Sequence, residues 1–157
     1  MVPAGNALGV LSRKAGNTMK TYRKAANTVL IVDEYPLFRK SLKSLLGKVS
    51  GYEVIDEAES GLEGFLKAMK HKPDLIIMDI SLPDMSGIHF INRLKDSKIN
   101  SRIIIVSLHS DAVYVSEAFN CGVSGYFSKL SDLGLLVSDL KVSKRAEFQA
   151  TGLTGGL

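Results

Sequence analysis

Hydrophobic residues follow two alternating patterns along this chain. Short aliphatic runs, which are typical of strands buried on both faces, alternate with segments in which apolar residues recur at helical spacing. The runs predict strands at residues 29–32, 52–57, 75–78, 103–106 and 125–127. The helical segments predict helices that begin near Pro36, Gly61, Gly87, Asp111 and Ser131. We expect Asp111 or Ser110 to cap the fourth helix and Gly122 to follow its end.

Strict alternation of strands and helices favours right-handed βαβ units and a parallel sheet that helices cover on both faces. Five strands are too few for the six-stranded dinucleotide-binding sheet, and no G-x-G-x-x-G motif follows the first strand. We therefore predict an α/β, flavodoxin-like (βα)5 three-layer sandwich with the strand order 2-1-3-4-5.

The charge of the chain is uneven. The whole chain carries +4, but residues 1–28 carry five basic residues and no acid, so the remainder sums to −1. The five are Arg13, Lys14, Lys20, Arg23 and Lys24. We predict a basic flexible extension over residues 1–27, with a nucleic-acid-binding arm or an organelle transit peptide as alternatives. The predicted domain covers residues 28–144, and helical periodicity fails after Lys144, which predicts a flexible tail over residues 145–157.

Composition restricts the setting of the protein. No apolar stretch approaches the ~18 residues that cross a bilayer, and 45% hydrophobic with 23% charged residues is ordinary for a globular protein. The single Cys121 excludes an intrachain disulfide, and no Cys/His set has zinc spacing. We therefore expect a reducing, cytoplasmic location.

Polar residues follow four of the five predicted strands. They are Asp33 and Glu34, Asp79, Ser107 and Lys129. Each alone has an ordinary interpretation as a turn acid, a cap or a surface lysine. However, the carboxyl ends of parallel strands share one edge of the sheet, where ligands bind. The strand order thus predicts that three carboxylates, one hydroxyl and one ammonium converge there.

Converged carboxylates repel one another unless a cation is present. Oxygen ligands suit Mg²⁺ better than zinc. A magnesium site beside an aspartate, a lysine and a serine suits a phosphoryl group. Asp79 would be the nucleophile, Lys129 would pair with the phosphoryl oxygens, and Ser107 would donate a hydrogen bond to them.

With these residues, residues 28–144 resemble a response-regulator receiver domain of two-component signalling. The motifs that carry the resemblance are VDEYPLFR (32–39), MDISLPDMSG (78–87), Ser107 and GYFSK (125–129). The strings PLFR and SLH (107–109) resemble receivers that precede a helix-turn-helix DNA-binding domain of the LuxR/NarL type.

The resemblance implies that Asp79 accepts a phosphoryl group from a histidine kinase, a phosphotransfer protein or a small phosphodonor. Asp33, Glu34 and Asp79 would bind Mg²⁺ together with the backbone carbonyl of Ser81. The family often has a second aspartate where Glu34 stands, so the longer side chain is expected to alter metal affinity.

The resemblance also implies a conformational switch. The hydroxyl of Ser107 would be drawn to the phosphoryl group, and Tyr126 would rotate inward and repack the face formed by the fourth helix, the fifth strand and the fifth helix. His109 and Ser81 would tune the phosphorylated state. The alternatives are a core or interface aromatic for Tyr126 and an exposed loop side chain for His109.

Two features depart from the family pattern. Leu130 stands where many receivers have proline, and we predict a cis Lys129–Leu130 peptide despite a cost of ~3–4 kcal/mol. Residues 145–157 are too few for a helix-turn-helix module, so we expect no output domain here, and DNA binding would belong to an absent segment. An excised, truncated or stand-alone receiver and a homodimer all stay open.

We therefore interpret the chain as a signalling switch that assists only its own phosphorylation and dephosphorylation, not as a turnover enzyme. An aspartyl-phosphate phosphohydrolase is disfavoured because Ser81 stands where such enzymes have a second acid. An interaction module that works without phosphorylation would lack the acid pair, Asp79 or Lys129, and all of these are present.

Overall fold

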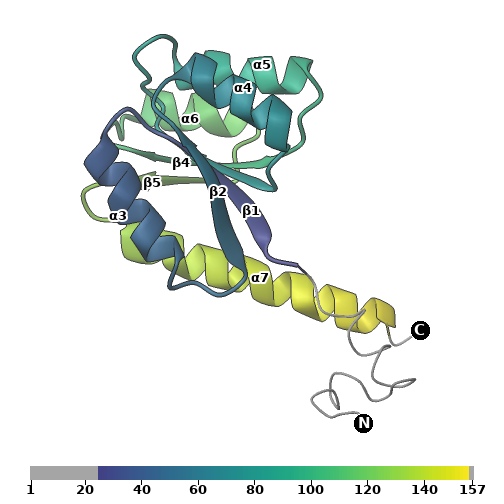
Figure 1. The fold of residues 1–157 in the computed structure, drawn as a ribbon. Coiled ribbons are helices and arrows are strands. Elements are labelled where there is room, and N and C mark those ends of the chain that lie inside the picture. The colour runs from purple at the N-terminus through teal and green to yellow at the C-terminus, as the bar shows by residue number, and fades with distance from the viewer. Residues whose placement is uncertain (1–24, 156–157) are drawn as a thin grey trace.

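The computed structural model describes residues 25–155, which form one parallel sheet with helices on both of its faces (Figure 1). The strand order is β2-β1-β3-β4-β5, which confirms the predicted topology. The strands are β1 (Asn27–Val32), β2 (Tyr52–Ala58), β3 (Leu75–Met78), β4 (Arg102–Ser107) and β5 (Gly125–Ser128). The basic segment predicted over residues 1–27 lies almost entirely outside the described residues.

The helices form two layers. They are α3 (Pro36–Leu46), α4 (Gly61–His71), α5 (Gly87–Asp96), α6 (Ala112–Asn120) and α7 (Leu133–Gly155). Helices α3 and α7 cover one face of the sheet, and α4, α5 and α6 cover the other (Figure 1). The fold is therefore the predicted three-layer α/β sandwich.

Alternation of side chains along the central strands divides the core into two halves. In β1, Leu30 and Val32 pack toward α4, α5 and α6. Val29 and Ile31 pack toward α3 and α7. All four residues of β3 are buried, as expected for a central parallel strand that is covered on both faces. The side chains of the central strands therefore face two apolar layers, one beneath each set of helices.

Local signals set most helix ends. Pro36 stands in the first turn of α3, and Ser60 caps α4 by accepting a hydrogen bond from the backbone N–H of Glu63 at 3.2 Å. Gly122 follows α6 with a φ of +95°, the left-handed conformation that favours glycine. Asp111 occupies the position before α6, but its side chain makes no capping hydrogen bond, so the predicted cap is only positional.

The expectation that helical structure ends at Lys144 is wrong, because α7 continues to Gly155. Residues 145–150 lack proline and glycine, so their intrinsic propensity permits a helix even without apolar periodicity. Tertiary contacts add to this. Glu147 accepts a hydrogen bond from Asn27 Nδ2 at 3.2 Å and pairs with Lys144 Nζ at 3.3 Å.

The predicted cis peptide between Lys129 and Leu130 is also wrong, since no cis peptide bond occurs among the described residues. Because no proline follows Lys129, the cis form of this peptide is less stable than the trans form by about 3–4 kcal/mol. Side chains hold this loop with trans peptides instead. Asp132 Oδ2 accepts from the backbone N–H of Ser128 at 2.9 Å, and Ser128 Oγ accepts from that of Leu130 at 3.1 Å.

Candidate functional site

Two aspartates lie side by side where the central strands end. The backbone N–H of Asp79 donates to the carbonyl of Val32 at 3.0 Å, and that of Asp33 donates to the carbonyl of Ala58 at 2.9 Å. These bonds continue the parallel ladder one residue beyond the strands. Asp33 and Asp79 are only 2% and 5% exposed. The sequence prediction that the two acids meet at this edge is confirmed.

Lys129 joins the two carboxylates. Its Nζ lies 2.6 Å from Oδ2 of Asp33 and 2.9 Å from Oδ2 of Asp79. The backbone N–H of Lys129 donates to the carbonyl of Ser107 at 3.0 Å, which carries the β4–β5 ladder into the site. The lysine side chain is 6% exposed, so the ion pairs lie in a largely desolvated environment.

The second oxygen of Asp79 is held by neutral donors. Ser107, which is fully buried, donates its hydroxyl hydrogen to Oδ1 at 2.7 Å. The backbone N–H of Ser81 donates to the same oxygen at 3.1 Å. The Asp79 carboxylate is therefore fixed by Ser107 and Ser81 on one oxygen and by Lys129 on the other.

The electrostatics of the site reflect burial and pairing. Burial raises the pKa of Asp33 above its ordinary value, and the contacts with Lys129 and with the backbone N–H of Tyr35 offset this only in part. For Lys129, burial opposes the charged form, but the close contacts with the carboxylates of Asp33 and Asp79 outweigh it and raise the pKa. The ammonium is therefore firmly protonated at neutral pH.

Part of the donor set suits a hard metal ion. Oδ2 of Asp33 is buried and accepts no well-directed hydrogen bond, although Lys129 Nζ lies close to it. This oxygen and those of Asp79 are hard ligands. Mg²⁺ usually binds one or two carboxylates of a protein and keeps several water ligands. Within residues 25–155, however, no three His, Cys, Asp or Glu side chains are gathered for a metal. Glu34 therefore does not complete a ligand cluster with the two aspartates.

The residues of the predicted switch are linked through the loop after β4. Tyr126 packs its ring against the core under α4, α5 and α6, and its hydroxyl donates to the backbone carbonyl of His109 at 2.5 Å. The backbone N–H of His109 donates to Ser107 Oγ at 3.2 Å. The exposed imidazole of His109 lies near the ring of Tyr114. The switch and tuning roles of these residues stay predictions.

Several residues around the site were assigned no role from the sequence. The rings of Tyr35 and Phe38 lie close to Lys129 Nζ. Arg39 Nη1 donates to the backbone carbonyl of Asp33 at 2.6 Å, and its Nε donates to Glu57 Oε1 at 3.1 Å. Their position in the sequence could have indicated a role, because they follow Asp33 and Glu34 within seven residues, at the start of a helix that packs beside the site.

Asp84 was missed as well. Its two carboxylate oxygens accept from the backbone N–H groups of Gly61 and Leu62 at 2.7 and 2.8 Å, which attaches the loop after Asp79 to the N-terminus of α4. Gly87 closes the same loop, with its N–H donating to the carbonyl of Ile80 at 2.7 Å. The loop that carries Asp79 is thus fastened at both of its sides.

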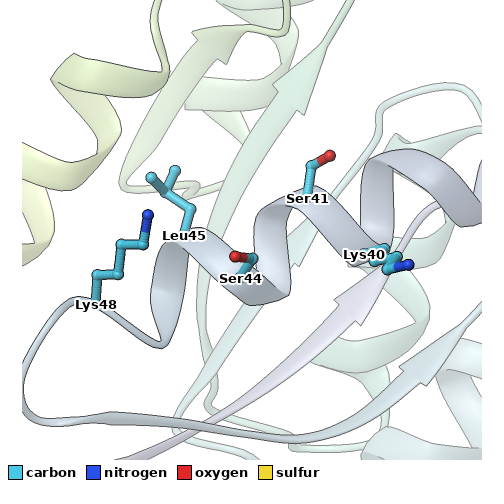
Figure 2. A pocket seen from close by; sticks show the side chains of 5 residues that line it. All are labelled: Lys40, Ser41, Ser44, Leu45 and Lys48. Carbon is cyan, nitrogen blue, oxygen red and sulfur yellow. The ribbon is translucent and has the colours of Figure 1, made fainter.

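A shallow hollow lies on α3, away from these residues. Figure 2 shows its lining side chains, which are Lys40, Ser41, Ser44 and Leu45 on the helix and Lys48 just after its end. None of them belongs to the Asp79 site. None of the helices within residues 25–155 has the length and hydrophobicity of a membrane-spanning segment.

Curated and solved relatives share this domain. Transcriptional regulatory protein DegU of Brevibacillus brevis is 31% identical over 114 residues, which cover 73% of this chain and 48% of that protein. A LuxR-family two-component response regulator from Aurantimonas sp. SI85-9A1 is 27% identical with a TM-score of 0.68, over 80% of this chain and 87% of that one. The chain spans about half the length of the curated relatives it matches.

Another solved relative contains a metal and a partner protein. In the CheX–CheY–BeF3–Mg²⁺ complex of Borrelia burgdorferi, the matching chain is 25% identical with a TM-score of 0.69, over 76% of this chain and 90% of that one. The family model for the response regulator receiver domain matches residues 29–141. The chain therefore belongs to the response regulator receiver domain family of two-component signalling and is related to regulators of the LuxR/NarL type.

Proposed function

We propose that Asp79 is the phosphoacceptor of this receiver domain and takes its phosphoryl group from a histidine kinase or a phosphotransfer protein. The proposal rests on one observation, which is that hydrogen bonds hold both carboxylate oxygens of Asp79. Ser107 and Ser81 hold Oδ1, and Lys129 holds Oδ2. A nucleophile fixed in this way needs little reorientation before attack.

In the proposed step a carboxylate oxygen of Asp79 attacks phosphorus. The bond from phosphorus to the donor's nitrogen or oxygen breaks, and the electron pair leaves with the donor. The product is an acyl phosphate on Asp79. Lys129 offsets negative charge on the phosphoryl oxygens, and the hydroxyl of Ser107 donates a hydrogen bond to one of them.

We propose Mg²⁺ as the cofactor, held by Asp33, Asp79 and the backbone carbonyl of Ser81. Glu34 is not gathered with the two aspartates in this structure, so it would have to turn toward the ion to become a further ligand. Support comes from the buried Asp33 oxygen that lacks a well-directed donor and from the magnesium named in the related CheY complex. Bound Mg²⁺ would neutralise charge on the transferring oxygens. Lys129 now contacts the same carboxylates, so it must share them with the ion.

We propose that phosphorylation is read out through Ser107 and Tyr126, which repack the face formed by α6, β5 and α7. His109 and Ser81 tune the lifetime of the phosphorylated state. The proposed output is control of a LuxR-type transcription regulator in the cytoplasm, in which a separate output domain contacts DNA. The domain acts as a switch and assists only its own phosphorylation and dephosphorylation.

A second candidate is a receiver that acts through protein–protein contact, including a homodimer. It is favoured by apolar side chains exposed on α6, where Val113 is 73% exposed and Phe119 is 48% exposed. Phosphorylation-dependent association of the purified chain would support this candidate, and a monomer in both states would contradict it.

The proposed function is tested by intact mass after incubation with Mg²⁺ and a small phosphodonor. Wild type should gain one phosphoryl group, and Asp79→Asn should gain none. Asp96→Asn, which changes an exposed acid at the end of α5, should behave like wild type. Phosphorylation of both wild type and Asp79→Asn, or of neither, would contradict the proposal.

A further inference from the structure

Two aromatic rings lie against the ammonium of Lys129. Its Nζ is 4.4 Å from the ring centroid of Phe38 and 5.0 Å from that of Tyr35. Both distances fall within the range of about 6 Å in which a cation is attracted to an aromatic face. The lysine side chain is 6% exposed, so water weakens this attraction little. The rings are therefore part of what holds the ammonium in place.

The carboxylates and the rings hold Lys129 in different ways. Oδ2 of Asp33 and Oδ2 of Asp79, which now contact the ammonium, are also oxygens that a divalent cation would take. Such a cation would weaken both ion pairs and repel the ammonium. The attraction to the rings does not depend on those oxygens. It would persist and would limit the movement of Lys129 away from the site.

We propose that Phe38, assisted by Tyr35, is a positioning residue that keeps the ammonium of Lys129 at the phosphoacceptor site when a metal ion engages the two aspartates. This inference rests on the proposed role of Asp79. Phe38 acts through Lys129 and touches no reacting atom. Phe38 should attract the ammonium more strongly than Tyr35 does, because its ring lies nearer to Nζ and packs against the core under α3 and α7. Tyr35 is 52% exposed and contributes less.

The first test is the rate of phosphorylation by phosphoramidate at saturating Mg²⁺, followed by intact mass. Phe38→Leu keeps an apolar side chain but removes the aromatic face, and it should slow the reaction about 2- to 30-fold. Phe38→Tyr keeps the ring and should stay near the wild-type rate. Thermal unfolding of each variant checks that the fold is kept. Tyr35→Leu changes an exposed ring, should fold normally and should slow the reaction less.

A matched control is available on the other side of the sheet. The ring of Phe65 on α4 contacts the guanidinium of Arg93 at 4.2 Å. Phe65→Leu therefore removes the same kind of contact without touching Lys129. It should leave the rate of phosphorylation unchanged. A loss equal to that of Phe38→Leu would overturn the inference, because it would point to general loosening of the core.

The second readout is the reactivity of the Lys129 amine with an acylating reagent in Mg²⁺, measured by peptide mass. Phe38→Leu should make Lys129 react faster, whereas Phe38→Tyr and Phe65→Leu should match wild type. Unchanged rate and unchanged reactivity in Phe38→Leu would overturn the inference, as would equal loss in Phe38→Tyr. If wild type gains no phosphoryl group, the proposed function fails separately, and the acylation experiment still tests the contact between the rings and Lys129.

Discussion

Replacing Lys129 with methionine tests the electrostatics of the site most severely. The substitution keeps most of the side-chain volume but removes the cation that contacts Asp33 and Asp79. The two carboxylate side chains are only 2% and 7% exposed, so both would be left buried without their partner. Removing one member of a buried ion pair costs about 3–5 kcal/mol. We expect a loss of that size in the free energy of unfolding at neutral pH without Mg²⁺.

The loss should depend on pH in a defined direction. Burial already raises the pKa of Asp33 above 3.8, and without Lys129 the pKa rises further. A carboxyl whose folded pKa is raised stabilises the fold fully below its unfolded pKa, and this contribution is lost as the pH rises through the folded value. The deficit of Lys129→Met should therefore be smallest below pH 3.8 and should grow as the pH rises through the raised pKa of Asp33.

Mg²⁺ should reverse part of the deficit. Ligand at 100 times its dissociation constant stabilises a folded protein by about 2.7 kcal/mol, and Lys129→Met offers the carboxylates without a competing ammonium. The double variant Asp33→Asn/Lys129→Met removes one uncompensated charge, so it should lose less stability and respond less to Mg²⁺. The measurement is urea unfolding followed by far-ultraviolet circular dichroism. A cost below about 1 kcal/mol, or one that is equal at every pH, would refute this account of the site.

Substitutions at three further positions test the surroundings of Asp79. Gly87→Ala places a Cβ 2.8 Å from the backbone of Ile80, which cannot move aside, and should cost about 1–3 kcal/mol in urea unfolding; an unchanged midpoint would contradict the close approach. Ser107→Ala removes a hydrogen bond to a charged group and should slow phosphorylation about 10- to 100-fold, whereas Ser107→Thr should retain the rate. At Asp84, slight burial raises the pKa, but the backbone N–H donors outweigh it and the pKa is lowered. The ionised Asp84 carboxylate therefore adds to the free energy of unfolding above pH 3.8, and this stabilisation is lost as the pH falls through the lowered pKa. The melting temperatures of wild type and Asp84→Asn should therefore converge in acid.

Residue pattern was enough to predict the sheet and the meeting of four groups at its edge. Parallel strands of the order 2-1-3-4-5 place their carboxyl ends together, so a residue at the end of a strand, or directly after it, is located once the order is known. Asp33, Asp79, Ser107 and Lys129 follow this rule, and the structure brings them into direct contact. Predicting that these four residues meet requires the strand order and no knowledge of side-chain conformation.

Other features depend on side-chain packing or on loop geometry, which spacing does not specify. Glu34 directly follows Asp33, yet no cluster of three metal-binding side chains forms within the described residues. Whether Phe38 meets Lys129 depends on how α3 packs beside the loop after β5. The peptide before Leu130 is trans, as is usual for a bond that does not precede proline. The part of α7 beyond Lys144 is joined to β1 by the hydrogen bond between Glu147 and Asn27, a contact that no periodicity reveals.

The central claim is that Asp79 itself carries the phosphoryl group. Its most direct test is reduction of the phosphorylated protein with borohydride, which converts an aspartyl phosphate to homoserine, followed by tandem mass spectrometry of the peptides. Homoserine at position 79 alone, formed only after treatment with phosphodonor and Mg²⁺, is the predicted result. Homoserine at another aspartate, or a stable phosphate on a hydroxyl side chain with position 79 unmodified, would contradict the claim.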